Sequence, residues 1–411
     1  MTITMVTSSY PRFPGDAIAT FMAPIAHGVA ARGHRVHVVA PWNPSWRRGE
    51  ADGDVHFHLY RYAPADRLNT FGYAGALRAD VQLRASAIVV SPLALAAGWR
   101  RTRRVVRDTR TDVVHAHWVV PGGVTAAAAR RGRPLIVSLH GSDVFLAERH
   151  AAARRAARWA FQRARWVTAC SADLRDRAVR LGASPHRISV VPYGVDTDRF
   201  RPDVDLRTAT RASLGVQPGA GLVFAYGRLV EKKGFSYLVD AVAALQRDFP
   251  STRLVVAGEG DLGEALRARA ETAGLGDRAR FVGVVPQHEI PAYLAAADVA
   301  VVPSVHDDAG NVDGLPNTVM EIMASATPLV TTAAGGIGAV ARDGETARIV
   351  PERDALAIAA AIGGILRQPV LARDMGARAR AHVEHEHSWS RVAGTFDDIY
   401  RRAMDPDTRR R

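Results

Sequence analysis

The sequence predicts an α/β protein with two doubly wound domains, each a parallel β-sheet covered by helices. Short apolar runs typical of buried strands alternate with longer stretches of helical apolar spacing. This alternation is interrupted by a Pro-, Asp- and Arg-rich stretch at residues 198–219, and then it starts again. The length of 411 residues also suits two domains of roughly 100–200 residues each. Strands that alternate with helices form right-handed βαβ units, and therefore parallel sheets.

The first predicted domain covers residues 1–197. A strand at 3–8 ends in a polar loop, and a helix at 17–32 is closed by Gly33, which is a typical helix C-cap residue. A strand at 35–40 ends at Pro41, and a helix-rich region follows at about 72–107. Four more buried strands are predicted at 113–116, 135–139, 166–169 and 188–191.

The second predicted domain covers residues 220–385, after a linker at 198–219. Its first strand, at 222–226, is followed by a helix at about 236–247. The remaining residues, 386–411, are expected to form a C-terminal helix that packs back on the first domain. Further strands of the second domain are predicted at 253–257, 299–303 and 328–331.

The cysteine content and the apolar segments bear on the compartment. The chain has a single cysteine, Cys170, so it has no disulfide framework within the chain, and a reducing compartment is expected. The N-terminus lacks the features of a signal peptide. The longest weakly polar run, at 85–99, is shorter than the ~20 residues of a membrane span and contains Pro92. We therefore expect a cytoplasmic protein, with a peripheral position at the inner membrane face as the alternative.

The positive charge is concentrated in the first half. The formal net charge is +13, yet residues 1–196 hold 28 Arg, no Lys and 13 acidic residues, and hence a formal charge of +15. An anionic membrane, an anionic acceptor or a nucleic acid would each account for this excess. No nucleic-acid-binding motif is present, so we expect no nucleic-acid partner. Simple enrichment in Arg is the alternative explanation.

A glycine-flanked basic loop follows the first strand of the second domain. It begins at Gly227 and contains Arg228 and Lys233, which lie five residues apart and could both reach one diphosphate. Cations at such a loop stabilise negative charge on a departing phosphate. Only two of the 54 basic residues are lysines, Lys232 and Lys233, which indicates either a site that requires a compact positive charge or a chance occurrence. A solvated basic turn is the alternative.

An acidic loop and helix form the second candidate segment. Asp313 is predicted in a loop and Glu321 two turns inside the following helix. Glu321 lies among apolar residues, so a solvated helix face explains it poorly. The helix start would leave backbone N–H groups free to bind an anion. The free N–H groups are expected near Leu315, Asn317 and Thr318, and Pro316, which has no N–H, suits the first turn of the helix.

These segments together resemble glycosyltransferase family 4, a family of retaining enzymes with the GT-B architecture. The resemblance extends over nearly the whole chain, because further motifs occur in the expected order. They are His34 in a Gly-His element, the HGSD segment at 140–143, PYGVD at 192–196, GEG at 258–260, FVG at 281–283, TPLV at 327–330 and the glycine pair 335–336.

The resemblance implies a role for each matching residue. Arg228 and Lys233 would bind the donor diphosphate, Glu321 would bind the ribose hydroxyls, and Asp313 would lie near the donor sugar. His140 would lie at the reacting sugar, so the implied catalytic residues are His140, Arg228, Lys233 and Asp313. The implied donor-binding set adds Gly227, Leu315, Pro316, Asn317 and Thr318, the loop of Gly15 and Asp16 near the donor phosphates and acceptor, and Gly283 and Val284 along the nucleotide base.

The sequence departs from the family pattern at three of these positions. Asp313 stands where the family usually has Glu. Pro14 precedes Gly15 where the family commonly has a glycine pair, and Ile337 follows the glycine pair 335–336 where the family often has Glu. Asp is one methylene shorter than Glu, so its carboxylate reaches less far towards the donor sugar.

The resemblance implies a retaining transfer from a nucleoside diphosphate sugar to an acceptor hydroxyl. The acceptor is expected to be a sugar or a lipid-linked precursor of a cell-envelope glycan. We expect no metal and no other cofactor, because cationic side chains would stabilise the leaving diphosphate and no zinc-ligand spacing is present. The alternatives are a sugar-nucleotide epimerase of the same architecture and a non-enzymatic protein that binds anionic polymers.

Overall fold

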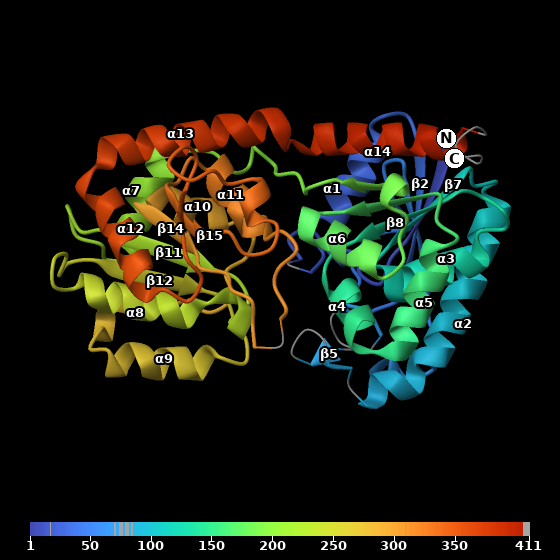
Figure 1. Ribbon diagram of the computed structural model, residues 1–411, viewed down its shortest axis with the longest axis horizontal. Helices are drawn as coiled ribbons and strands as arrows, with labels where there is room; N and C mark the ends of the chain where they lie inside the picture. Colours follow the sequence, from blue (N-terminus) through green and yellow to red (C-terminus); the bar gives the residue numbers. More distant parts are fainter. Residues whose placement is uncertain are drawn as a thin grey trace. The chain divides into compact units, whose positions relative to one another are not determined.

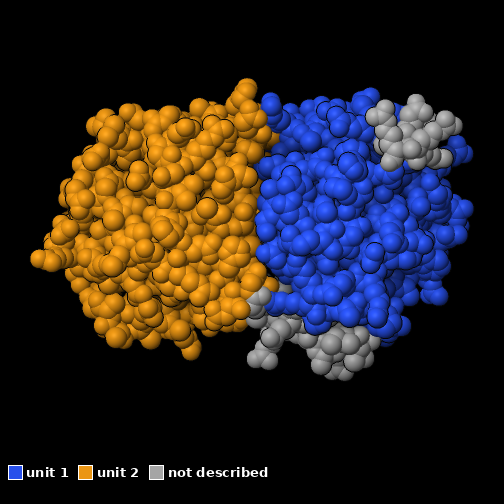
Figure 2. Space-filling view, in the orientation of Figure 1, with its two compact units in different colours: residues 1–193, 389–411 blue, residues 194–388 orange. Residues whose placement is uncertain are grey.

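The computed structural model describes residues 1–16, 18–69, 71–73, 77–78, 82–83, 85–308 and 310–405. The chain folds into two compact units (Figures 1 and 2). Unit 1 comprises Met1–Tyr193 and Trp389–Arg411, and unit 2 comprises Gly194–Ser388. Each unit contains a sheet of parallel strands with interleaved helices, which confirms the predicted α/β class with two Rossmann-like domains.

Unit 1 is built on an eight-stranded sheet in the order β10-β9-β8-β7-β1-β2-β4-β3. All neighbouring strands are parallel except the pair β3 and β4 at one edge. A two-stranded antiparallel sheet, β5 and β6, lies apart from it. The bounds are β1 Thr2–Val6, β2 Arg35–Pro41, β3 Ala51–Asp52, β4 Val55–Tyr60, β5 Leu77–Arg78, β6 Gln82–Leu83, β7 Val113–His117, β8 Leu135–Leu139, β9 Trp166–Ala169 and β10 Ile188–Val190.

The C-terminal helix α14, Trp389–Met404, belongs to unit 1 and packs on α1. Buried Phe396 and Tyr400 of α14 join the same core cluster as Ile3, Met5 and Ile25. The predicted helix at 17–32 is shorter in the structure, because residues 18–21 form turns and α1 begins at Met22. The other helices are α1 Met22–Ala30, α2 Ala85–Asp108, α3 Val124–Ala129, α4 Ser142–Arg149, α5 Ala151–Phe161 and α6 Ala172–Arg180.

A histidine pair couples the stability of unit 1 to pH. His37 of β2 and His58 of β4 lie with Nδ1 and Nε2 3.0 Å apart, and His37 also stacks on His56. Burial lowers the pKa of both His37 and His58 from 6.5 to about 4, and the positive charge of Arg101 further lowers that of His58. The folded protein therefore takes up these protons less readily than the unfolded chain does.

We expect the free energy of unfolding to fall as the pH is lowered from 6.5 towards 4. A histidine with a depressed pKa destabilises the fold only where the unfolded chain is protonated, which is below its ordinary pKa. Urea unfolding across this range should show a flatter slope for the His37→Gln, His58→Gln double variant than for the unmodified chain. His288→Gln, at an exposed histidine, is the control and should leave the slope unchanged. A slope in the double variant equal to that of the unmodified chain would show that His37 and His58 do not cause the pH dependence.

Unit 2 has a six-stranded, fully parallel sheet in the order β13-β12-β11-β14-β15-β16. Successive strands run outward from β11 to one edge and then from β14 to the other, so the order reverses between β11 and β14. Ligands of such sheets bind at this reversal, outside the carboxyl ends of the strands. The bounds are β11 Leu222–Tyr226, β12 Arg253–Ala257, β13 Ala279–Phe281, β14 Val299–Val302, β15 Leu329–Thr332 and β16 Arg348–Val350.

Helix α7, Val204–Ser213, lies inside the range 198–219, where the sequence analysis expects a linker. Arg207 fixes it to unit 2 by donating to the carbonyls of Ala295, Ala296 and Ala297 and to the carboxylate of Asp298. Part of this stretch is therefore an ordered helix. The other helices of unit 2 are α8 Phe235–Leu245, α9 Gly263–Thr272, α10 Ile290–Ala296, α11 Asn317–Ala324, α12 Ala355–Arg367 and α13 Pro369–Glu386.

Within the described residues, no single helix is both long enough and apolar enough to cross a membrane. The sharply bent pair α12 and α13 meets these criteria only when its two helices are taken together.

Candidate active site

The basic loop after β11 lies against the loop after β12 in unit 2. Gly227 donates its N–H to the Ala257 carbonyl at 2.9 Å, and Leu229 donates to the Glu259 carbonyl at 2.9 Å. A Cβ on Gly258 would lie 1.9 Å from the Gly227 carbonyl oxygen, so only glycine allows this approach. These contacts fix the backbone that carries Arg228, whose side chain is exposed.

Lys232 and Lys233 both pair with Asp313. The Lys232 Nζ atom lies 2.9 Å from Asp313 Oδ1, and the Lys233 Nζ atom lies 2.5 Å from Asp313 Oδ2. The two lysines belong to a short 3-10 helix, η4 Glu231–Lys233, which ends at Gly234 in a left-handed conformation. The structure thus brings together two predicted catalytic residues, Lys233 and Asp313, and adds the second lysine.

Asp313 is charged in this arrangement. Burial alone would raise the pKa of its carboxyl, but the ammonium groups of Lys232 and Lys233 outweigh burial and hold the pKa well below its usual range. The carboxylate neutralises one of two adjacent positive charges and fixes the position of both. The net charge of this trio is +1, which suits an anionic ligand.

Gly335, in the loop after β15, lies against the backbone carbonyl of Asp313. Its φ is +62°, and a Cβ there would lie 1.9 Å from the Asp313 carbonyl oxygen. Gly344 has a similar φ of +73°, but a Cβ on Gly344 would meet nothing within 4 Å. Substituting alanine at each glycine therefore distinguishes the cost of a left-handed backbone from the cost of steric overlap with Asp313.

We expect Gly335→Ala to lower the free energy of unfolding by about 2–4 kcal/mol, and Gly344→Ala by only about 1 kcal/mol. Both variants place Cβ in the left-handed region, but only the first forces the Asp313 backbone to move. Equilibrium unfolding in urea measures the difference. Equal losses in the two variants would show that the close approach of Gly335 to Asp313 carries no energetic weight.

Glu321 lies on α11 and is buried, with 8% of its surface exposed. Its Oε2 accepts a hydrogen bond of 2.5 Å from the Tyr226 hydroxyl, and its Oε1 accepts one of 3.3 Å from Gln287. Burial raises the pKa of Glu321, and the hydrogen bonds from Tyr226 and Gln287 oppose that rise. The prediction that Glu321 is more than a solvated helix residue is consistent with this burial.

The start of α11 differs by one residue from the prediction. Pro316 is the N-cap residue, in an extended conformation, and the helix begins at Asn317. Pro316 fits there because its carbonyl accepts from Val319 while its ring needs no partner for an N–H. Leu315 is buried just before it, and the Thr318 hydroxyl is buried without a hydrogen-bond partner in the structure.

Gly283 and Val284 follow β13, next to the loop after β12. The Gly283 carbonyl accepts a hydrogen bond of 2.7 Å from the Gly258 N–H, and Gly283 has a φ of +72°. The Val284 side chain is 61% exposed, which is unusual for valine. Gly227, Gly258 and Gly283 therefore form one edge of unit 2 at the carboxyl ends of β11, β12 and β13.

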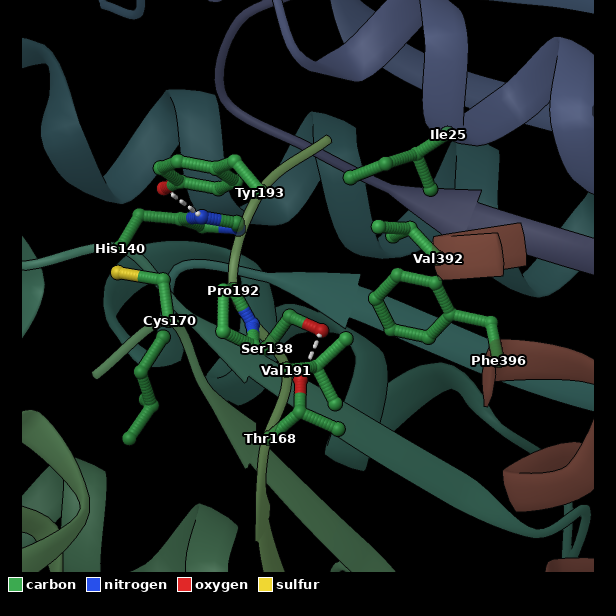
Figure 3. A pocket seen from close by; sticks show the side chains of 11 residues that line it. Ile25, Ser138, His140, Thr168, Cys170, Val191, Pro192, Tyr193, Val392 and Phe396 are labelled. Carbon is green, nitrogen blue, oxygen red and sulfur yellow. Dashed lines mark hydrogen bonds between the residues drawn. The ribbon is translucent and has the colours of Figure 1, made fainter. Parts of the chain in front are cut away.

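His140 follows β8 in unit 1, and both of its ring nitrogens are occupied. Nδ1 lies 2.7 Å from the Tyr193 hydroxyl, and Nε2 lies 3.1 Å from His117 Nδ1. Figure 3 shows the His140 ring and the Tyr193 hydroxyl facing each other beside a small cavity, with room for about one water molecule. Burial lowers the pKa of His140 well below its usual value, and nearby His117 adds to this effect. His140 is therefore a neutral imidazole held in a fixed orientation.

Gly15 and Asp16 lie in the loop after β1. Gly15 has a φ of +86° and open space around it. The buried Asp16 carboxylate accepts hydrogen bonds from the Arg12 side chain at 2.7 and 3.0 Å and from the Arg12 and Ile18 backbone N–H groups. The Asp16 side chain is thus used to hold the loop, and Gly15 is the more accessible of the two predicted contacts.

A groove of about 820 Å³ lies at the opposite ends of the unit 2 strands. Its lining includes Ala220, Thr252 and Asp298, which directly precede or approach the amino ends of β11, β12 and β14. None of the predicted site residues lines it. The candidate site, at the carboxyl ends, is therefore distinct from this groove.

Comparison with known proteins agrees with this geometry. The sequence matches the family description "Glycosyltransferase Family 4" over residues 18–199 and "Glycosyl transferases group 1" over residues 207–382. It is 32% identical over 294 residues to the GDP-mannose-dependent alpha-(1-6)-phosphatidylinositol monomannoside mannosyltransferase of Mycolicibacterium smegmatis, with 70% of this chain and 76% of that protein covered. The chain belongs to glycosyltransferase family 4. It is an enzyme that transfers a glycosyl unit from a nucleotide-sugar donor.

Further members of the family and solved structures extend the comparison. The D-inositol 3-phosphate glycosyltransferase of Streptomyces scabiei is 32% identical over 324 residues, which cover 74% of this chain and 71% of that protein. Anabaena HepE in complex with UDP superposes with a TM-score of 0.72 at 19% identity and covers 97% of this chain and 99% of its own. Sucrose-phosphate synthase from Thermosynechococcus elongatus gives 0.77 at 20% identity, with 97% and 98% covered. These structures show the GT-B fold.

Three residues of the candidate site are not predicted from the sequence. Tyr226 and Gln287 bind Glu321, and Lys232 shares Asp313 with Lys233. The lone lysine pair was a usable signal for Lys232. Nothing in the sequence pattern points to Tyr226 or Gln287, because both become neighbours of Glu321 only when separate strand ends meet at one edge.

Among the described residues, no group of three or more His, Cys, Asp or Glu side chains is arranged to hold a metal ion. Asp307 and Asp308, an acidic doublet after β14, are both bound by other side chains of unit 2. Asp307 accepts from Asn311, and the largely exposed Asp308 pairs with Arg353 at 3.1 Å.

Proposed function

We propose that this enzyme transfers a hexosyl unit with retention, without a metal ion, from a nucleoside diphosphate sugar to a hydroxyl group of a cell-envelope glycan precursor. The observation that carries the proposal is the trio of Lys232, Lys233 and Asp313 at the carboxyl end of the unit 2 sheet. It combines a fixed ammonium group with a net positive charge beside a glycine-rich loop. The family assignment favours glycosyl transfer over the alternative of a sugar-nucleotide epimerase.

The leaving diphosphate gains negative charge as its bond to the sugar breaks. Lys233, with the exposed Arg228 on the same loop, is proposed to bind this diphosphate and to stabilise that charge. Because Asp313 already fixes the Lys233 ammonium, little reorganisation is needed during the reaction. Such a cationic pocket takes the part that a metal ion plays in other transferases, and this supports metal independence.

The retention of configuration is proposed from membership of the family rather than from a nucleophile. Asp313 is paired with two lysines and Glu321 is bound by Tyr226, so neither carboxylate is placed as a free nucleophile. A front-face displacement, in which the leaving phosphate accepts the proton of the acceptor hydroxyl, needs none.

The donor is tested by thermal shift with GDP-mannose, UDP-glucose, ADP-glucose and dTDP-glucose, with and without EDTA. A rise in melting temperature with one of them, unaffected by EDTA, is expected. GDP-mannose is the first choice because the M. smegmatis relative is described as GDP-mannose-dependent. If none of the four stabilises the protein, the proposed function is wrong. If the stabilisation requires a divalent ion, metal independence is wrong.

We propose that the acceptor is presented at an anionic membrane surface. Two relatives are described as acting on a phosphatidylinositol mannoside and on D-inositol 3-phosphate, which are polyol acceptors that carry phosphate. Helices α2 and α5 of unit 1 both pack on α3 and carry exposed arginines. This basic face supports electrostatic attachment to anionic lipid. Its members are Arg100, Arg103, Arg104 and Arg107 of α2, Arg154, Arg155 and Arg158 of α5, and Arg163 in the turn after α5.

Flotation with phosphatidylglycerol-containing vesicles tests the membrane proposal. We expect the enzyme to float at low salt and the Arg103→Glu, Arg104→Glu variant to float much less, since each basic residue adds roughly 1 kcal/mol at such a surface. Reversal of two exposed arginines in unit 2, Arg247 and Arg373, is the matched control. Flotation that is absent, or equally reduced in both variants, would remove the basic face from the proposal.

A further inference from the structure

An aromatic cluster surrounds His140 in unit 1. It consists of Phe21, Trp118, His140 and Tyr193. The Phe21 ring stacks on both His140 and Tyr193, with each pair of ring centroids 4.6 Å apart. Trp118 packs against His140 at 4.7 Å and against Phe21 at 5.7 Å. Their chain positions follow β1, β7, β8 and β10, so the cluster gathers at the carboxyl ends of the unit 1 strands.

Trp118 has an unusual backbone for a bulky residue. Its φ is +61° with ψ of 117°, and non-glycine residues adopt positive φ only at an energetic cost. Strained residues of this kind concentrate at binding and catalytic sites, where the surrounding structure maintains them.

Three hydrogen bonds and one buried carboxylate maintain this conformation. The Trp118 N–H donates to the Ser138 carbonyl at 2.9 Å, and the Trp118 carbonyl accepts from Gly123 at 2.8 Å. The next residue, Val119, donates its N–H to Asp143 at 2.7 Å, and Asp143 is 2% exposed. Asp143 also accepts from the N–H groups of His140 and Gly141, so one side chain ties the Trp118 loop to the His140 loop.

The Trp118 side chain is only partly buried, as are Phe21 and His140. Both Trp118 and Phe21 pack against the unit 1 core, and each side chain keeps part of its surface exposed beside His140. Aromatic faces are electron-rich and bind the polarised C–H faces of pyranose and cyclitol rings, whose hydroxyl groups point outward. The Tyr193 hydroxyl, which lies 2.7 Å from His140 Nδ1, can make a further hydrogen bond at the edge of such a ring.

We infer that Trp118 is an acceptor-binding residue, whose indole stacks on a six-membered polyol ring of the acceptor and selects it over a linear alcohol. This inference rests on the proposed function and names the class of acceptor that unit 1 recognises. Asp143 is a positioning residue, because it acts only through the Trp118 and His140 loops.

The test measures transfer kinetics with D-inositol 3-phosphate, methyl α-mannoside and glycerol as acceptor probes, using the donor identified by thermal shift. We expect transfer to at least one ring acceptor and none to glycerol. Trp118→Ala and Trp118→Gly should both raise the acceptor KM about tenfold, and Trp118→Phe should restore most of the affinity. Donor-induced stabilisation should be the same in all three variants. Trp99→Ala, at another partly exposed tryptophan of unit 1, is the control.

The glycine variant separates binding from folding. Glycine tolerates φ of +61°, so Trp118→Gly should be more stable than Trp118→Ala while its acceptor KM is equally raised. An acceptor KM that follows stability across the variants, or that does not change, would overturn the inference, as would equal transfer to glycerol or no transfer to any ring acceptor while the donor binds. Absence of donor binding would instead remove the proposed function, and this inference with it.

Discussion

Replacing Lys233 by methionine is expected to abolish the stabilisation that the donor confers and to slow transfer by about 10²–10³-fold. The Lys233 side chain lies close to the backbone of Gly227. Its Cε and Nζ atoms would be 3.7 and 3.9 Å from a Cβ atom placed on that glycine. Its ammonium group therefore lies close to Gly227, where we propose that the diphosphate approaches the backbone. Methionine keeps most of the apolar stem of the side chain and removes only the charge.

Lys232→Met is the matched control for this prediction. It removes an ammonium that pairs with the same carboxylate, but leaves the Lys233–Asp313 pair of 2.5 Å, so we expect a smaller loss of donor affinity than in Lys233→Met. Lys233→Arg retains the charge but spreads it over a larger planar group, and we expect only partial recovery. Thermal shift with the donor and initial rates measure all three variants. Donor affinity that is unchanged in Lys233→Met, or lost equally in Lys232→Met, would contradict the role given to Lys233.

The order of strands and helices could be predicted because apolar runs and their spacing report burial directly. The central strands β1, β7, β8, β9 and β11 lie within a few residues of their predicted positions. The strands β5 and β6 lie within residues 72–107, which the sequence predicts to be helix-rich, and β3, β4, β13 and β16 are also not predicted. The last four lie at or near sheet edges and carry exposed or half-buried residues, so their sequences lack a continuous apolar run.

The candidate site could be predicted where the residues that carry the chemistry lie close together in the sequence. The basic loop and the acidic helix each stand out by residue type, and the structure joins them through Lys233 and Asp313. The shorter side chain of Asp313 reaches two lysines, and its contact with the donor sugar stays a prediction. What sequence could not supply is proximity between distant segments, as in Tyr226 with Glu321 or Trp118 with Phe21.

Glu321→Gln is expected to reduce donor affinity about 10- to 100-fold, because a charged hydrogen bond to the ribose contributes roughly 1.5–3 kcal/mol. The variant should nevertheless be at least as stable as the unmodified enzyme. Burial raises the pKa of Glu321, so the ionised carboxylate is held in a place that disfavours its charge. Glutamine has the same shape and can still accept from Tyr226 without that charge. Loss of affinity together with loss of stability would point to a structural role instead.

A double-mutant cycle with altered nucleotides locates the contact of Glu321 on the donor. The unmodified enzyme should bind the 2′-deoxy and 3′-deoxy forms of its nucleoside diphosphate more weakly than the parent, because each lacks one donor to the carboxylate. In Glu321→Gln, most of that difference should disappear, since the partner of the hydroxyl has already been weakened. Tyr226→Phe is the control, because it removes a hydrogen bond to Glu321 but leaves the carboxylate available to bind the ribose, so the deoxy penalty should remain. A deoxy penalty of the same size in Glu321→Gln would place the ribose elsewhere, and would leave Glu321 with Tyr226 and Gln287 as a purely structural network.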